Sequence, residues 1–212
     1  MYLPQNFRQD DLATLHEAIR RTAFGTLVTQ GSAGMEASHV PMLIDAKAGP
    51  HGTLKGHIAR ANPQWQQAAA GADALAIFLG PQTYISPAWY VTKQETGKVV
   101  PTWNYVAIHA YGKPRFIEDA EWLRALVTEL TETHERPRAD PWAVTDAPAD
   151  FVDGMLRAIV GFELRIERLE GKWKMSQNRP PKDRARVLEG LAQKDGEVHA
   201  AVAEQIRFAN RK

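Results

Sequence analysis

Tyrosine and tryptophan gather in one stretch of the chain, residues 80–105, which reads GPQTYISPAWYVTKQETGKVVPTWNY. Small hydrogen-bonding residues stand beside these aromatics, and three prolines in the stretch disfavour the middle of a regular strand or helix. Buried Tyr and Trp polar atoms need partners, so the stretch differs from ordinary apolar core. Aromatic faces mixed with hydrogen-bonding groups on a stiff loop favour a site for a flat heteroaromatic ligand.

A second group of polar residues lies in the segment 56–63, GHIARANP. His57 belongs to a predicted strand, and Arg60 and Asn62 follow it just before a short predicted helix. A cation, an imidazole and an amide at such a turn could hold a phosphate group, helped by the free N–H groups of the helix. The structural alternative is a surface arginine, a helix-capping asparagine and a core histidine, and the spacing alone favours that alternative.

Three further patterns of residues bear on chemistry. His39 follows Ser38, but no third residue is placed to orient it, so we expect a structural histidine and assign no catalytic residue. His39, His57 and His109 lie on different predicted strands without metal-ligand spacing, so we expect no metal site. The polar segment 174–179 after Trp173 is either a surface turn or a contact to a ligand or partner subunit.

The elements that must position these residues are short strands with helices at the start, middle and end. Strands are predicted at 22–29, 37–44, 53–59, 74–79, 105–116 and 159–168, with a turn at 170–171 into 172–176. Helices are predicted at 10–21, 63–70, 119–134, 149–156, 183–191 and 196–210. Pro41 suggests an edge strand or a bulge. Strands joined by turns predict an antiparallel sheet or barrel, in a mainly β, α+β chain.

Composition is that of an ordinary globular protein, with 212 residues, 44% hydrophobic and 24% charged. We expect a single domain over 1–212 with a helical appendage at about 183–212. The absence of cysteine, of a signal-peptide pattern and of a membrane-length apolar run predicts a cytoplasmic protein without a membrane partner. The net charge of +1 and an Ala-rich last helix argue against a DNA-recognition helix, so DNA stays a possible partner without a clear reading element.

Several longer motifs occur in an order that resembles the PaiB-like family of FMN-binding negative transcriptional regulators. They are MYLPQNF, HVPMLI, GHIARANPQW, FLGPQTYISPAWY, VPTWNYVAIHAYG and WKMSQNR, and together they span nearly the whole chain. The resemblance implies an FMN-binding split β-barrel of the pyridoxamine-phosphate-oxidase-like type, with flanking and C-terminal helices. It also implies a homodimer with FMN at the interface between subunits.

The same resemblance supplies expected FMN contacts. His57, Arg60 and Asn62 would hold the phosphate, and His39 would border the ring. The cleft would be lined, partly from the partner chain, by Tyr84, Ser86, Trp89, Trp103, Asn104, Lys174, Ser176 and Gln177. Three functions remain open: an FMN-binding transcriptional regulator, a flavin-dependent oxidoreductase acting on a small molecule, or a protein that stores flavin or forms a structural dimer stabilised by it.

Overall fold

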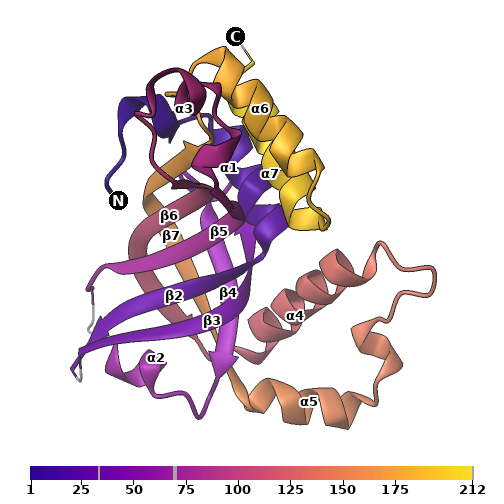
Figure 1. The fold of residues 1–212 in the computed structure, drawn as a ribbon. Helices are drawn as coiled ribbons and strands as arrows, with labels where there is room; N and C mark the ends of the chain where they lie inside the picture. Colours follow the sequence, from indigo (N-terminus) through magenta and orange to yellow (C-terminus); the bar gives the residue numbers. More distant parts are fainter. Residues whose placement is uncertain (33, 69–70, 212) are drawn as a thin grey trace. The chain divides into compact units, whose positions relative to one another are not determined.

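The computed structural model describes residues 1–32, 34–68 and 71–211 (Figure 1). The strands are β1 (Arg8–Gln9), β2 (Phe24–Gly31), β3 (Gly34–Asp45), β4 (Thr53–Ala59), β5 (Ala74–Ile85), β6 (Thr102–Ile117) and β7 (Ile159–Lys174). The α-helices are α1 (Leu12–Thr22), α2 (Gln64–Gln67), α3 (Val91–Thr96), α4 (Ala120–Glu135), α5 (Ala149–Arg157), α6 (Pro181–Ala192) and α7 (Glu197–Ala209). Short 3-10 helices cover Gln5–Phe7, Pro87–Trp89 and Val144–Asp146.

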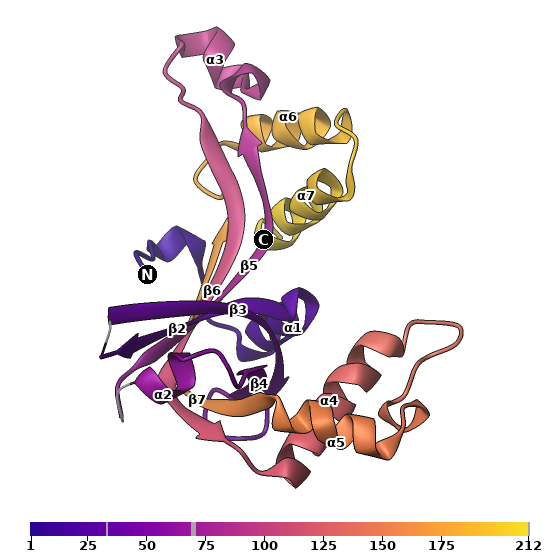
Figure 2. The same ribbon diagram turned by 90° about the horizontal axis from the view of Figure 1, so that it is seen from below.

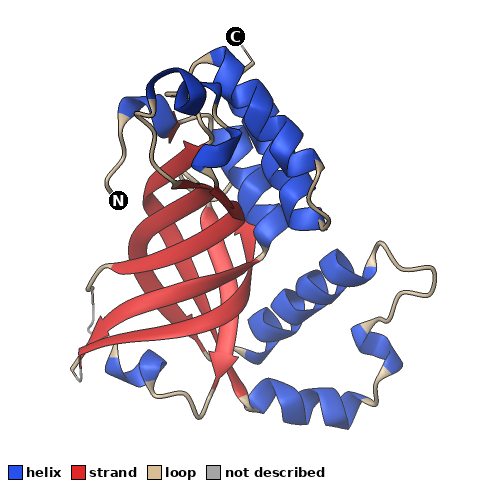
Figure 3. Ribbon diagram, viewed as in Figure 1, coloured by secondary structure: helices blue, strands red, loops and turns tan. Residues whose placement is uncertain are grey.

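The strands, red in Figure 3, form one sheet. Its strand order is β1-β7-β4-β3-β2-β5-β6. β2 pairs antiparallel with β3 and β5, and β4 pairs antiparallel with β3 and β7. β6 also pairs with β7, so the six strands β2, β3, β4, β5, β6 and β7 form a closed circuit. Closure of this kind removes the exposed edges of an open sheet and is the pattern of a small barrel.

The chain forms two compact units, and β5, β6 and β7 contribute residues to both. Unit 1 comprises Met1–Leu15, Leu79–Ile108 and Glu170–Lys212, and unit 2 comprises His16–Phe78 and His109–Leu169. The expectation of a single domain with a helical appendage concerns how the chain folds, and it stays a prediction.

Unit 2 has a core of alternating inward side chains from its strands. Leu27, Phe78, Phe162 and Leu164 are fully buried there. Gly112 of β6 allows the closest strand approach, because a Cβ at this position would lie 2.1 Å from the carbonyl oxygen of Arg165 in β7. α4 and α5 pack together through a separate apolar cluster of Leu123, Val152 and Leu156 (Figure 1).

Unit 1 is built around the helix pair α6 and α7 and the ends of the long strands (Figure 2). Val187 of α6 and Val202 and Ile206 of α7 are buried. Trp173 of β7 donates its indole N–H to Gln205 of α7 at 2.8 Å, which joins the last helix to the strand. Among the described residues, no helix is long and apolar enough to cross a membrane.

Most elements occur near their predicted positions, and the exceptions have local causes. The expected loop at 80–85 is the second half of β5, because β5 pairs with β2 only over 74–77 and Pro81 therefore breaks no bond of that ladder. The polar part of the aromatic stretch contains the helix α3. This helix is ended by Gly97, which adopts the left-handed conformation at φ 69°.

Two other expectations about strands are wrong. The turn predicted at 170–171 is instead part of the continuous strand β7, because Gly171 pairs with Gln9 of β1. The glycine also leaves room for Leu15, since a Cβ at position 171 would lie 2.2 Å from the Leu15 side chain. Pro41 suggested an edge strand or a bulge, and the edge strand is wrong because β3 pairs with both β2 and β4, while the bulge stays a prediction. The pairing of β3 with β4 starts at Met42, so Pro41 lies at the end of that ladder, where no N–H is needed. The predicted helix at 63–70 is α2, and its Ala69 and Ala70 lie outside the described residues.

Candidate functional site

The twelve predicted site residues divide between the two units. His39, His57, Arg60 and Asn62 lie in unit 2, and the other eight lie in unit 1. Each group is described within its own unit.

The turn from β4 to α2 holds Asn62 and Arg60 in a dense hydrogen-bond network. The amide nitrogen of Asn62 donates to the Ser38 hydroxyl at 2.8 Å, and its oxygen accepts from the Gln64 N–H at 2.9 Å. The Arg60 guanidinium donates to the carbonyls of Arg157 and Ile159 and forms an ion pair with Glu118. Arg60 therefore has part of its donor capacity left for a ligand, and its charge is already partly balanced.

Gln64 is a buried polar residue of this turn that the sequence reasoning missed. Its amide nitrogen lies within hydrogen-bond distance of the Leu27 carbonyl, the Thr29 hydroxyl and the Glu36 carbonyl. Its amide oxygen is buried and has no hydrogen-bond partner in the described part of the chain. The signal was available, because Gln64 belongs to the quoted GHIARANPQW motif.

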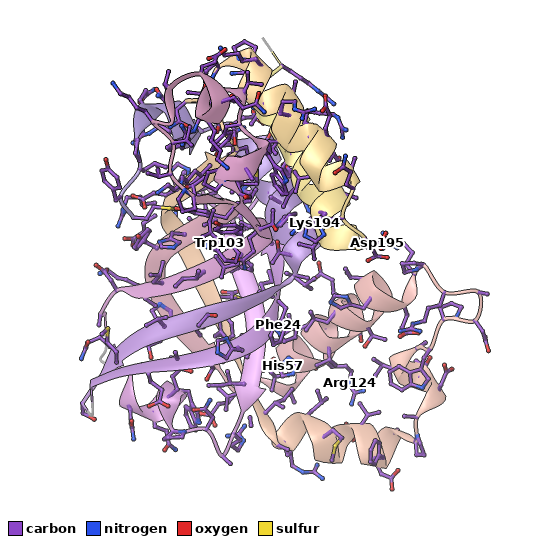
Figure 4. The ribbon with its side chains drawn as sticks, in the orientation of Figure 1. Phe24, His57, Trp103, Arg124, Lys194 and Asp195 are labelled. Carbon is purple, nitrogen blue, oxygen red and sulfur yellow. The ribbon has the colours of Figure 1, made fainter. Side chains whose placement is uncertain are left out.

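His57 lies on the face of β4 opposite Gly56 and Ile58 and lines an open pocket in unit 2 (Figure 4). The pocket is also lined by Leu130 and His134 of α4 and by Trp142. The Nδ1 atom of His57 is buried without a hydrogen-bond partner among the described residues. Burial lowers the pKa of His57, so its imidazole is neutral near pH 7 and could exchange a hydrogen bond with a ligand.

His39 is exposed on β3, and its Nδ1 lies 2.9 Å from the Thr26 hydroxyl. Within the described ranges no group of three or more His, Asp or Glu side chains is placed to hold a metal ion.

The aromatic residues of unit 1 have two kinds of surroundings. Tyr84 and Trp103 are 44% and 52% exposed and form an edge-to-face pair with ring centroids 6.4 Å apart. Trp89 instead packs on α6, where a Cβ added at Gly190 would lie 2.5 Å from its indole, and Lys194 lies over its ring. Ser86 accepts the N–H of Ala88 and so caps the 3-10 helix that contains Trp89.

The remaining predicted residues of unit 1 meet where β6 begins and β7 ends. Lys174, Asn104 and Ser176 line a small polar pocket there, together with Thr102 and with Asn178 and Arg179 of the polar segment 174–179. Gln177 shapes the turn instead, because its side chain accepts the N–H of Met175 and donates to the Trp173 carbonyl. All six pocket residues belong to two of the quoted motifs, VPTWNY and WKMSQNR.

Comparison with known proteins finds similarity over most of the chain. Residues 1–168 match the family described as "Putative FMN-binding domain". The chain is 33% identical to the protease synthase and sporulation protein PAI 2 of Bacillus subtilis (strain 168), over 96% of this chain and 95% of that protein. It is also 33% identical to an uncharacterized protein of Emericella nidulans, over 98% of this chain and 96% of that protein.

Solved structures with low sequence identity share the fold. An FAD and heme binding protein from Mycobacterium smegmatis superposes with a TM-score of 0.57 at 15% identity, covering 79% of this chain and 73% of that one. A conserved hypothetical protein from Mycobacterium tuberculosis gives 0.58 at 13% identity, covering 85% and 94%. Together with the closed circuit of strands, these likenesses confirm the predicted fold class, an α+β split β-barrel of the pyridoxamine-phosphate-oxidase-like type.

Proposed function

The chain belongs to the PaiB-like family of FMN-binding proteins, with FMN as its cofactor, and we propose that it acts as an FMN-dependent homodimeric regulator of transcription. The observation that carries the proposal is the family match over residues 1–168, together with a 33% identical relative over 96% of the chain. The cytoplasmic location expected from the sequence is part of the same proposal.

The donor groups of unit 2 fit a flavin phosphate and ring edge. Arg60 and Asn62 would hold the phosphate, with the Ser38 hydroxyl beside them. His57 has the buried, unpartnered Nδ1 that a hydrogen-bonding ligand would satisfy. Bound FMN would supply hydride or single-electron transfer, while these side chains bind and orient it.

The phosphate assignment is tested by comparing FMN with riboflavin, which lacks the phosphate. Arg60→Ala should weaken FMN binding by about 1.5–3 kcal/mol, the size of a charge-assisted hydrogen bond to an ionised group, and leave riboflavin binding unchanged. Fluorescence titration of the flavin measures both affinities. Equal losses for the two ligands would mean that Arg60 acts on the fold of the turn and not on the phosphate.

Exposed apolar side chains support the homodimer. Leu79, Val100 and Trp103 of unit 1 are all more than half exposed, at 56%, 63% and 52%. A contiguous patch of exposed apolar residues marks a surface that a partner covers, and we propose that these three side chains belong to such a patch. We propose that a second copy of the chain covers them.

The terminal helices do not favour direct reading of DNA. In α6, Lys182 pairs with Glu95, Arg186 pairs with Glu189, and the Arg184 guanidinium donates to the Arg179 carbonyl. These cations are already engaged within unit 1, whereas phosphate contacts need free ones. We therefore propose regulation through the flavin and the dimer, with α7 packing in unit 1 and not serving as a recognition helix.

Gene deletion and a gel-shift assay together test this mode of regulation. Deletion should change the transcript levels of a defined set of genes, and their upstream fragments should show no salt-sensitive shift with the FMN-loaded protein. Unchanged transcripts would refute the regulatory role. A specific shift at micromolar protein would refute the indirect mode and establish DNA contact.

A flavin-dependent oxidoreductase is the second candidate. It is favoured by the open pocket at His57, which a small molecule could enter. Anaerobic mixing of the FMN-loaded protein with NADH or NADPH tests it through bleaching of the flavin absorption. The absence of bleaching, and of turnover with any added electron acceptor, would remove this candidate.

A further inference from the structure

A small pocket in unit 1 is lined entirely by hydrogen-bonding side chains, and none of them is acidic. Thr102 and Asn104 come from the start of β6, Lys174 from the end of β7, and Ser176, Asn178 and Arg179 from the loop after it. Four of these residues lie beyond residue 168, where the family match ends. The match therefore does not assign this pocket.

The pocket has an excess of positive charge. The Lys174 ammonium donates to the Thr102 hydroxyl, which is neutral. Burial lowers the pKa of Lys174, the charges of Lys172 and Arg179 lower it further, and Tyr105 opposes them. In the described part of the chain, neither Lys174 nor Arg179 forms an ion pair with a carboxylate.

Lys172 adds a nearly buried cation beside the pocket. It is 8% exposed, donates to the Tyr2 carbonyl at 2.9 Å, and has the Tyr2 and Tyr105 rings within about 6 Å of its ammonium. The Arg179 guanidinium lies 4.6 Å from the centroid of the Tyr90 ring, which is also uncharged. Three cations with neutral partners are costly to bring together, unless an anion binds among them.

The inner wall of the pocket is rigid and polar. Asn104 and Ser176 are 1% and 3% exposed, and the Asn104 amide donates to the Ser176 hydroxyl at 2.9 Å. Ser176 has a φ of 62°, a left-handed conformation that costs a serine on the order of 1 kcal/mol. The turn is secured by the Arg179 N–H donating to the Ser176 carbonyl and by Asn210, the residue that follows α7, donating to the Met175 carbonyl.

We propose that this pocket binds a phosphate monoester through Lys174, Arg179 and the hydroxyl and amide groups around them. Phosphate oxygens accept several charge-assisted hydrogen bonds at once, and their negative charge would balance the uncompensated cations. The ligand is either the phosphate of FMN itself, which rests on the proposed FMN binding but replaces Arg60 and Asn62 as the phosphate contacts, or a separate phosphorylated small molecule, which does not rest on it. Both present the same chemistry to the pocket.

The test uses the full chain freed of flavin, titrated calorimetrically with inorganic phosphate and by fluorescence with FMN and riboflavin. Lys174→Met removes the charge at nearly constant size. Lys182→Met is the matched control, because it removes one lysine charge from the same unit but at the exposed ion pair with Glu95. Lys174→Arg keeps the charge and should retain binding.

We expect Lys174→Met to weaken inorganic phosphate binding by about tenfold or more, the effect of one charge-assisted hydrogen bond, and Lys182→Met to leave it within about twofold. Loss of FMN but not riboflavin affinity in Lys174→Met would identify the flavin phosphate as the ligand. Unchanged flavin affinities with weakened phosphate binding would identify a separate ligand.

Two results would overturn the inference. One is that the parent protein binds no phosphate and its preference for FMN over riboflavin is the same in Lys174→Met. The other is that Lys182→Met weakens binding as much as Lys174→Met, which would indicate a general charge effect. If Lys174→Met does not fold, Arg179→Gln takes its place in the same titrations. The phosphate titration is informative even if the chain binds no flavin.

Discussion

Arg60 illustrates how one side chain can serve both the fold and a ligand. Its guanidinium already contacts Glu118 and two backbone carbonyls, so a phosphate must share it with the carboxylate. Glu118→Gln removes the competing charge while keeping the side-chain shape. We predict that Glu118→Gln tightens FMN binding several-fold and leaves riboflavin binding unchanged, as measured by flavin fluorescence titration. If FMN binding is unaltered, Arg60 does not reach the phosphate.

His57 provides a pH prediction. Burial lowers its pKa from the ordinary value of 6.5, so between the lowered pKa and 6.5 the unfolded chain binds more protons than the folded chain. Its contribution to stability is therefore fully present above pH 6.5 and is lost as the pH falls through that window. Urea unfolding of the parent at pH 5 to 7 should show this loss, and His57→Leu should reduce it.

His39→Leu is the control for this pH dependence, because it removes an exposed histidine from the same unit. It should retain the acid sensitivity of the parent protein. The assignment to His57 is wrong if His57→Leu loses stability with acid as steeply as the parent does.

At the residue level, the sequence motifs predicted which polar residues lie near a site, but not which hydrogen bonds and ion pairs these residues form. Lys174, Asn104 and Ser176 lie around one pocket, although 72 residues separate Asn104 from Ser176. The ion pair between Arg60 and Glu118 could not be predicted from the sequence, because 58 positions separate the two residues and only the fold brings them together. The roles of the predicted FMN contacts stay predictions.

At the scale of elements, the packing of α6 on Trp89 depends on one glycine. A Cβ at Gly190 would lie 2.5 Å from the indole, closer than packed atoms approach. Gly190→Ala should lower the free energy of unfolding by about 1–3 kcal/mol through overpacking, despite the better helix propensity of alanine. Urea unfolding measures the change.

Gly154 in α5 is the matched control, because an added Cβ there would meet only the Arg157 guanidinium at 3.8 Å. Gly154→Ala should therefore raise the free energy of unfolding by up to about 1 kcal/mol, the propensity difference between glycine and alanine in a helix. If both substitutions change the free energy of unfolding in the same direction, Trp89 does not pack on α6 as described.

The sequence predicted helices and strands correctly where apolar residues recur regularly. It failed where the pairing of a strand with its neighbours determines the structure. The predicted strand at 53–59 coincides with β4, whose apolar residues alternate. The stretch 80–85 looked like a loop because of Gly80 and Pro81, yet it extends β5. The proline penalty depends on which edge of the strand is paired, and a single sequence does not contain that information.

At the scale of the whole molecule, the proposed homodimer predicts a mass twice the 23.6 kDa of one chain. Trp103→Asp places a charge among exposed apolar residues of unit 1 and should shift the protein towards monomer in sedimentation velocity. Trp142→Asp is the control, as an equally exposed tryptophan of unit 2 that should leave the mass unchanged. A monomeric parent protein would refute the proposed assembly.

The most direct test of the central claim is the absorption spectrum of the purified protein after FMN is added and the excess removed. We predict flavin bands in the near-ultraviolet and blue that stay with the protein, at about one flavin per chain. The Arg60 and Lys174 variants would then tell which pocket holds the phosphate. A colourless protein after the same treatment would contradict FMN binding by this chain and leave the phosphate pocket of unit 1 as a site for another ligand.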